Sequence, residues 1–161
     1  MANEMKVYVL ELLENYHKRA REIALLRYEL AHPVRVTEDD LIEAMSYAHQ
    51  DGVGRPEGHI SNKTLYIALN YREQAGRLNT ENVGEISAKL TRLEREQARL
   101  EYYISLLEPR QEQVLRRLYL ERMPREKAAD EFGLSVRRLQ EIRVQAIESL
   151  AEMYCFTDAL Y

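Results

Sequence analysis

The chain has 161 residues, of which 45% are hydrophobic and 31% are charged. This composition is typical of an ordered protein of one or two small domains and excludes a low-complexity chain. No apolar run reaches the roughly 20 residues that a membrane-spanning helix needs, and residues 1–6 lack the layout of a signal peptide, so we expect a cytoplasmic protein without membrane contact. The net charge of −4 and the pI near 5.7 argue against a broadly basic surface that coats nucleic acid.

Heptad-like spacing predicts a helix over residues 4–31. Its apolar residues recur at steps of four and three, as Met5, Val9, Leu12, Tyr16, Ile23, Leu26 and Leu30. Arg19 interrupts this stripe, and Pro33 ends the helix because the residue before a proline avoids helical dihedral angles. Thr37, followed by three acidic residues, predicts the N-cap of a short helix that ends near His49. A helical hairpin is the simplest arrangement of these segments.

A turn-rich segment over residues 51–62 follows. Its glycines match neither the dinucleotide-binding fingerprint nor the phosphate-binding loop, so we interpret it as a connector. Helical spacing resumes over residues 63–74. Residues 1–75 are therefore predicted to form a helical N-terminal region.

A second heptad run follows a linker predicted at residues 76–80. Its members are Ile86, Leu90, Leu93, Gln97, Leu100, Ile104 and Leu107. They predict a coiled-coil-like connecting helix within residues 76–107, in which Gln97 is a polar core position of the kind that sets register or partner number. Three arrangements stay open: an antiparallel hairpin with the first heptad helix, a homodimer through the heptad helices, or an ordinary bundle helix.

Three short helices are predicted over residues 108–154. Pro109 suits the first position of a helix that ends near Arg122, and Pro124 starts a second helix that ends at residue 133. A helix-turn-helix needs a small residue where its helices cross, a glycine in the turn, a cap for the second helix and apolar anchors on that helix. The residues that fit these structural roles are Ala129, Gly133, Ser135, Leu139 and Ile142.

The third of these helices carries the predicted DNA contacts. The face opposite Leu139 and Ile142 offers side chains that can read base edges in a major groove. These predicted base-reading residues are Val136, Arg137, Gln140, Glu141 and Val144. Cations around that face suit phosphate contacts. The predicted phosphate-binding residues are Arg116, Arg117, Arg122, Arg125, Lys127, Arg138 and Arg143.

Residues 108–154 resemble region 4 of the sigma-70 family. The resemblance lies in the run LSVRRLQEIRVQAIESL at residues 134–150, which follows the pattern LSxxxLxxIRxxAIxxL. It implies binding of double-stranded DNA at a promoter element and contact with RNA polymerase. No stretch resembles the aromatic-rich region 2 that opens promoter DNA.

The remainder is similar in layout to phage regulators of the ArpU and RinA type. The segments ELLENYHKRAREI and GHISNKTLYIAL carry this second resemblance. It implies a phage or prophage activator of late genes, with a helical N-terminal part and a sigma-like C-terminal domain.

Other classes of function fit the sequence less well. The four histidines are scattered without metal-ligand spacing, and no nucleophile and base pair can be picked out, so we expect no enzyme, no cofactor and no metal. Two binding functions stay open: a DNA-packaging subunit similar to a small terminase, which would form a ring, and an adaptor that binds RNA polymerase but not DNA. We expect an all-α fold. Its tail, residues 155–161, continues an apolar segment that should pack on the domain or a partner, with Cys155 as a small hydrophobe.

Overall fold

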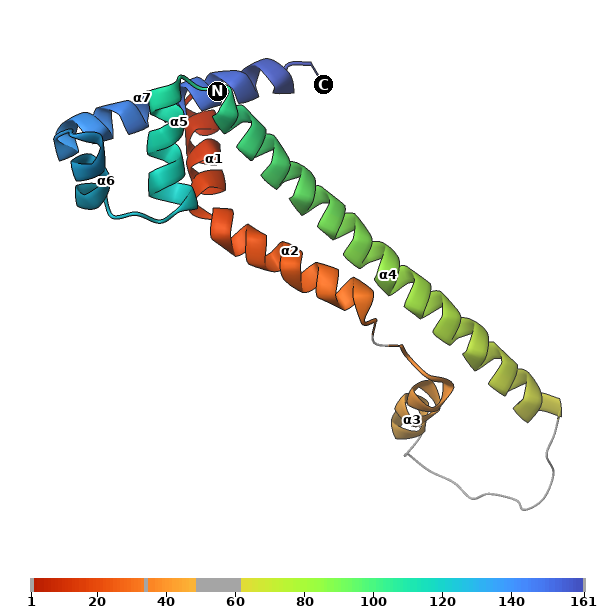
Figure 1. Ribbon diagram of the computed structural model, residues 1–161. Coiled ribbons are helices and arrows are strands. Elements are labelled where there is room, and N and C mark those ends of the chain that lie inside the picture. The colour runs from red at the N-terminus through yellow and green to blue at the C-terminus, as the bar shows by residue number, and fades with distance from the viewer. Residues whose placement is uncertain (1, 34, 49–61, 161) are drawn as a thin grey trace. The chain divides into compact units, whose positions relative to one another are not determined.

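The structure, a computed structural model, describes residues 2–33, 35–48 and 62–160. All elements in these ranges are helices, which confirms the predicted all-α class. They are α1 (Ala2–Glu14), α2 (Tyr16–Ala31), α3 (Glu38–Ala48), α4 (Asn62–Ser105), α5 (Pro109–Leu115), the π-helix η1 (Arg116–Leu120), α6 (Arg125–Phe132) and α7 (Val136–Asp158) (Figure 1). In the part of the chain that the structure describes, no helix is long and apolar enough to cross a membrane.

The chain divides into two compact units. The first unit consists of residues 1–24 and 91–161, and the second consists of residues 25–90. This division differs from the segments expected from the sequence pattern, because α1 belongs with the C-terminal helices. The predicted connector lies outside the described residues except for its last residue, Asn62, which begins α4.

The helix predicted over residues 4–31 is interrupted at Asn15, so the prediction of one continuous helix is wrong. The Nδ2 atom of Asn15 donates to the carbonyl oxygen of Glu11 at 2.9 Å, and its own amide nitrogen donates to the same oxygen at 3.0 Å. Asparagine side chains that bond nearby backbone groups compete with the regular helical pattern. The helix α2 then runs to Ala31 and stops before Pro33, as predicted.

In the second unit, Thr37 and Asp40 cap the start of α3 reciprocally. The amide nitrogen of Asp40 donates to Thr37 Oγ1 at 3.2 Å, and the amide nitrogen of Thr37 donates to Asp40 Oδ2 at 2.8 Å. The hydrogen bonds from the backbone and side chain of Thr37 lower the pKa of Asp40. The predicted cap is therefore confirmed.

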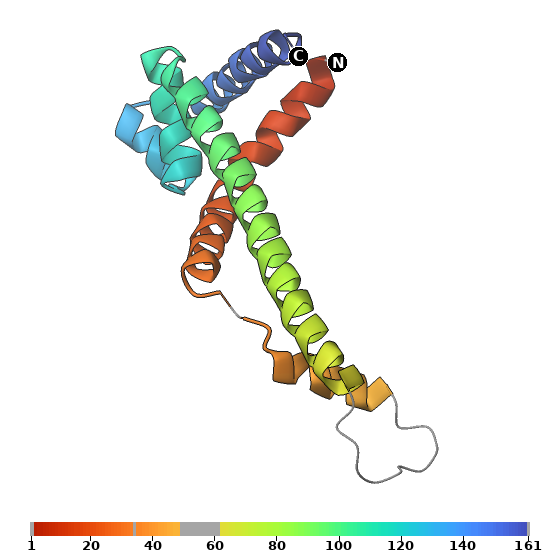
Figure 2. The ribbon, with the colours of Figure 1, turned by 90° about the vertical axis from the view of Figure 1, so that its right-hand side faces the viewer.

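The helix α4 passes through residues 76–80 without a break, so the linker predicted there is wrong. Figure 2 shows its uninterrupted ribbon. Thr80 Oγ1 donates to the carbonyl oxygen of Gly76 at 2.9 Å, and Arg77 pairs with Glu73 one turn earlier at 3.3 Å. A single glycine costs a helix only about 1 kcal/mol relative to alanine, which a helix of this length tolerates.

The main core of the first unit lies where α1, the end of α4, α5 and α7 meet. Its buried members are Val9, Leu12, Leu13, Leu100, Ile104, Leu107, Leu115, Ala146, Ile147, Leu150, Ala151 and Tyr154. The ring of Tyr154 meets Tyr8 and Tyr103 edge to face, with ring centroids 5.8 and 4.8 Å away. The C-terminal half of α7 is thus part of this core, and residues 155–158 of the predicted tail form the last turn of α7.

A buried polar pair joins α2 to α4 within the first unit. Arg19 Nε donates to Gln97 Oε1 at 2.8 Å, and Arg19 Nη2 donates to the carbonyl oxygen of Leu12 at 2.9 Å. Glu96 lies 3.7 Å from Arg19 Nη1. The polar heptad position Gln97 is therefore matched by the arginine that interrupts the first heptad stripe of the same chain.

Candidate nucleic-acid interface

Residues 133–135 form a tight turn between α6 and α7. Gly133 has φ 61° and ψ 36°, the left-handed conformation that glycine adopts without steric cost. The amide nitrogen of Leu134 donates back to the carbonyl oxygen of Ala129 at 2.9 Å, which closes the end of α6. Ser135 caps α7, since its Oγ accepts from the amide nitrogen of Arg138 at 3.1 Å.

A second apolar cluster holds α5, α6 and α7 together. Its buried members are Val114, Ala128, Ala129, Leu139 and Ile142. The two alanines of α6 are small, so α6 and the first turns of α7 can approach closely. Four partly buried side chains pack against the cluster: Leu118, Met123, Phe132 and Leu134.

The face of α7 that points away from this cluster is largely open. Val136 and Val144 are exposed, and the side chain of Arg137 is 88% exposed. Gln140 is half-buried, and its Oε1 atom is enclosed without a hydrogen-bond partner in the described chain. Arg137 and the two valines are therefore accessible to a partner, whereas Gln140 must rotate to present its whole amide.

Glu141 pairs with both arginines of this face. Its carboxylate accepts from Arg138 Nη1 at 2.9 Å and lies 3.5 Å from Arg137 Nε. The hydrogen bond from Arg138 is the main cause that lowers the pKa of Glu141. This predicted base-reading carboxylate therefore balances part of the positive charge beside it.

Two more of the predicted phosphate-binding arginines pair with carboxylates of the same unit. Arg116 Nε donates to Glu112 at 2.8 Å. Arg117 pairs with Glu121 on the next turn, and Glu131 of α6 lies 3.6 Å from its Nε atom. Arg116 and Arg117 each lie four residues from their carboxylate partner, a spacing on a helix that the sequence alone shows.

Arg143 contacts Tyr119, and no sequence pattern predicts this contact. Arg143 Nε donates to the Tyr119 hydroxyl at 2.6 Å, and its guanidinium lies 5.5 Å from the centre of the Tyr119 ring. His17 Nε2 lies 3.0 Å from the Tyr119 carbonyl oxygen. These residues belong to three different helices, so no periodic pattern relates them.

Arg122, Arg125 and Lys127 form a separate cationic group before and within the first turn of α6. All three are exposed, and none has an ion pair within the described ranges. Arg122 has φ 53°, a left-handed conformation that is uncommon outside glycine. These side chains are available to an anionic partner without breaking an internal contact.

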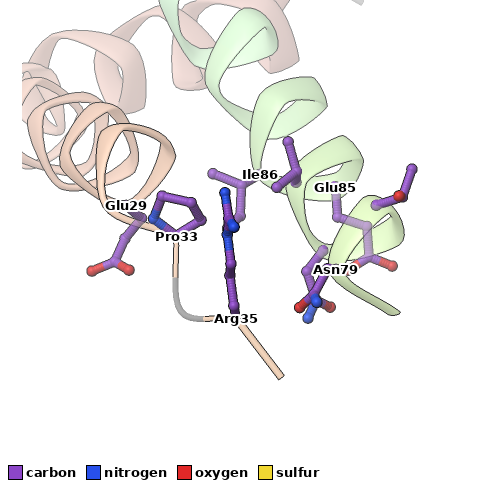
Figure 3. Close-up of a pocket in the computed structure, with 9 residues that line it drawn as sticks. Glu29, Pro33, Arg35, Asn79, Glu85 and Ile86 are labelled. Atoms are coloured by element: carbon purple, nitrogen blue, oxygen red, sulfur yellow. The ribbon is translucent and has the colours of Figure 1, made fainter. Parts of the chain in front are cut away.

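The second unit contains a pocket of about 610 Å³. Figure 3 shows the Arg35 side chain extending between Pro33 and the α4 residues that line it, among them Asn79 and Ile86. Asn79 Oδ1 accepts from the amide nitrogen of Val36 at 2.8 Å, and its Nδ2 donates to the Val36 carbonyl oxygen at 3.2 Å. Asn79 therefore attaches to α4 the segment that precedes α3. This attachment gives the pocket a structural explanation.

Among residues 2–33, 35–48 and 62–160, no group of three or more metal-binding side chains comes together. Comparison with models of protein families, with curated proteins and with solved structures yields no significant match.

Proposed function

We propose that this protein is a sequence-specific regulator of transcription, and that α6, the turn at residues 133–135 and α7 form a helix-turn-helix that binds double-stranded DNA. One observation carries the proposal. Small alanines of α6 pack against α7, and Gly133 in the left-handed conformation forms the turn between the two helices. The opposite face of α7 presents exposed Val136, Arg137 and Val144. That combination is what a recognition helix needs in a major groove.

The exposed residues have distinct roles in this proposal. Arg137 pairs with a guanine edge, and Val136 and Val144 meet thymine methyl groups. The 3.5 Å contact of Arg137 with Glu141 is a surface ion pair, and such pairs contribute little to stability. Arg137 can therefore exchange this carboxylate for a base at small cost.

Arg122, Arg125 and Lys127 supply phosphate contacts. They have no internal partners to lose, so binding of a phosphate adds a contact without removing one. The paired arginines Arg116 and Arg117 lie next to carboxylates and contribute less net charge. A chain of net charge −4 thus still offers available positive charge beside the recognition helix.

The resemblance of residues 134–150 to sigma region 4 supports a promoter element as the DNA target. The looser resemblance of the remainder supports a phage or prophage late-gene activator. Both are part of the proposal.

Selection of bound sites from random duplex DNA tests this function. The purified full chain, at near-physiological salt, is expected to enrich one defined motif. The Arg137→Ala variant should enrich no motif or a less specific one. The control Arg92→Ala removes an exposed arginine of α4 outside the site and should enrich the same motif as the unmodified chain. If the unmodified chain enriches no motif, the proposed function fails for this protein.

A further inference from the structure

A groove of about 760 Å³ lies in the first unit between the end of α4, the start of α5 and the last turns of α7. Its walls carry large apolar side chains that are exposed: Tyr102 by 62%, Leu106 by 53% and Phe156 by 71%. Exposed apolar side chains that gather in one depression are typical of an interaction site.

The groove has a negative rim. Glu108 and Glu152 line it, and neither forms an ion pair within the described part of the chain. Arg99 bonds to the lining residue Thr157, but Asp158 already pairs with this arginine at 2.9 Å. Unbalanced carboxylates repel phosphates, which excludes nucleic acid and anionic lipid and favours an apolar partner that carries lysine or arginine.

The helix α2 of this chain has a surface that carries both apolar and cationic side chains. Four residues follow one another at steps of three, four and three and therefore share one face of the helix: Lys18, Arg21, Leu25 and Tyr28. All four are exposed, and Leu25 and Tyr28 are exposed by 64% and 60%. No carboxylate of the described residues pairs with Lys18 or Arg21. This outer face is distinct from the buried face that carries Arg19 and Ile23.

We propose that α2 of a second copy of this chain docks in the groove, with Leu25 and Tyr28 on its apolar walls and Lys18 and Arg21 near Glu108 and Glu152. Because the contact joins two different surfaces, it closes into a dimer when each copy docks its α2 in the groove of the other.

The groove and the recognition residues occupy successive stretches of α7. Phe156 follows Val136 by 20 positions, about 30 Å along the helix, and the first groove residue of α7, Ser149, follows Val144 by five positions, about 7.5 Å. The test of the dimer uses the protein without DNA, so its outcome does not depend on the proposed function.

Charge reversal tests the contact by sedimentation equilibrium of the full chain across a range of concentrations. The unmodified protein should show a mass near twice 19.0 kDa. Two variants, K18E/R21E and E108K/E152K, should each dimerise at least about tenfold more weakly, because like charges then face each other. An equimolar mixture should dimerise again, since each acidic surface then meets a basic one. The control K89E/R92E, which reverses two exposed cations of α4 at the same spacing, should behave as the unmodified chain.

Three results would overturn the proposal: a monomer at every concentration, variants that dimerise as tightly as the unmodified chain, or a mixture that stays monomeric. Circular dichroism of each variant shows whether it keeps its helical fold, so that weaker dimerisation can be assigned to the lost contact.

Discussion

Arg137 and Lys127 are both exposed cations, but they occupy different parts of the proposed interface. Arg137→Ala should cost about 1 to 3 kcal/mol at the selected site and relax base choice there, because it removes a contact to a base edge. Lys127→Ala should weaken binding to all duplexes about equally and flatten the salt dependence by roughly one unit of slope, because it removes a phosphate contact. Titrations of selected and scrambled duplexes over a salt series measure both effects. Equal losses with unchanged specificity would place the recognition face elsewhere.

Tyr154 has a buried hydroxyl that no group of the described chain hydrogen-bonds. Burial is the main cause that raises the pKa of this side chain, so it stays neutral at physiological pH. A buried polar group without a partner costs stability, and Tyr154→Phe should therefore raise the free energy of unfolding by about 1 kcal/mol in urea titrations.

Tyr103→Phe is the control for this prediction, because the Tyr103 hydroxyl accepts a hydrogen bond from Arg99 at 3.2 Å. That variant should be slightly less stable than the unmodified chain. A clear loss of stability in Tyr154→Phe would show that its hydroxyl has a partner.

At the scale of elements, the α6 to α7 turn depends on backbone conformation and capping. Gly133→Ala should lower stability by about 1 kcal/mol, and the cause is the left-handed backbone alone, since an added Cβ would meet no atom. Ser135→Ala should lower it by about 1 kcal/mol through the lost cap. Gly84→Ala, in the interior of α4 and also in open space, should stabilise instead. Thermal unfolding measures all three, and a loss in Gly84→Ala equal to that in Gly133→Ala would contradict this explanation.

The pair of Arg19 and Gln97 sets how α2 lies against α4 within the first unit. Gln97→Leu should cost about 3 kcal/mol, because it leaves a buried guanidinium short of an acceptor. The double variant R19M/Q97L should lose less stability than the two single variants added together, since it removes both polar groups. A double-mutant cycle in urea measures this coupling, and strict additivity would show that the two side chains act independently.

At the scale of the molecule, the first unit is built from both ends of the chain. Leu13 of α1 is buried with Leu150 of α7, so Leu13→Ala should cost about 2 to 5 kcal/mol and also weaken DNA binding near its unfolding midpoint. Val7→Ala, at an exposed position of the same helix, should have little effect. Residues 108–154 alone should not unfold cooperatively, because α1 and the end of α4 complete their core. Cooperative unfolding of that fragment would contradict this view of the unit.

Local signals predicted much of the fold. Pro33 marks the end of α2, Thr37 caps α3, and Gly133 and Ser135 delimit the turn before α7, each because the residue acts on its own backbone or on that of its close neighbours. The same kind of reasoning went wrong at Gly76, where a helix-disfavouring residue was interpreted as a break. Propensity is a weak preference that the rest of a long helix overrides.

By itself, the sequence determined the helical class, most helix ends and the set of residues on each face of α7, because these depend on periods and caps that span only a few positions. Only the tertiary structure decided that α1 joins the C-terminal helices, that Arg19 finds Gln97, and that Tyr119 holds Arg143. The tertiary structure also decided which arginine and lysine side chains have no internal partner and are available to an anionic partner. The physical reason is that these contacts join residues far apart in the chain, where partner choice depends on how whole helices pack and on which buried polar groups must be satisfied.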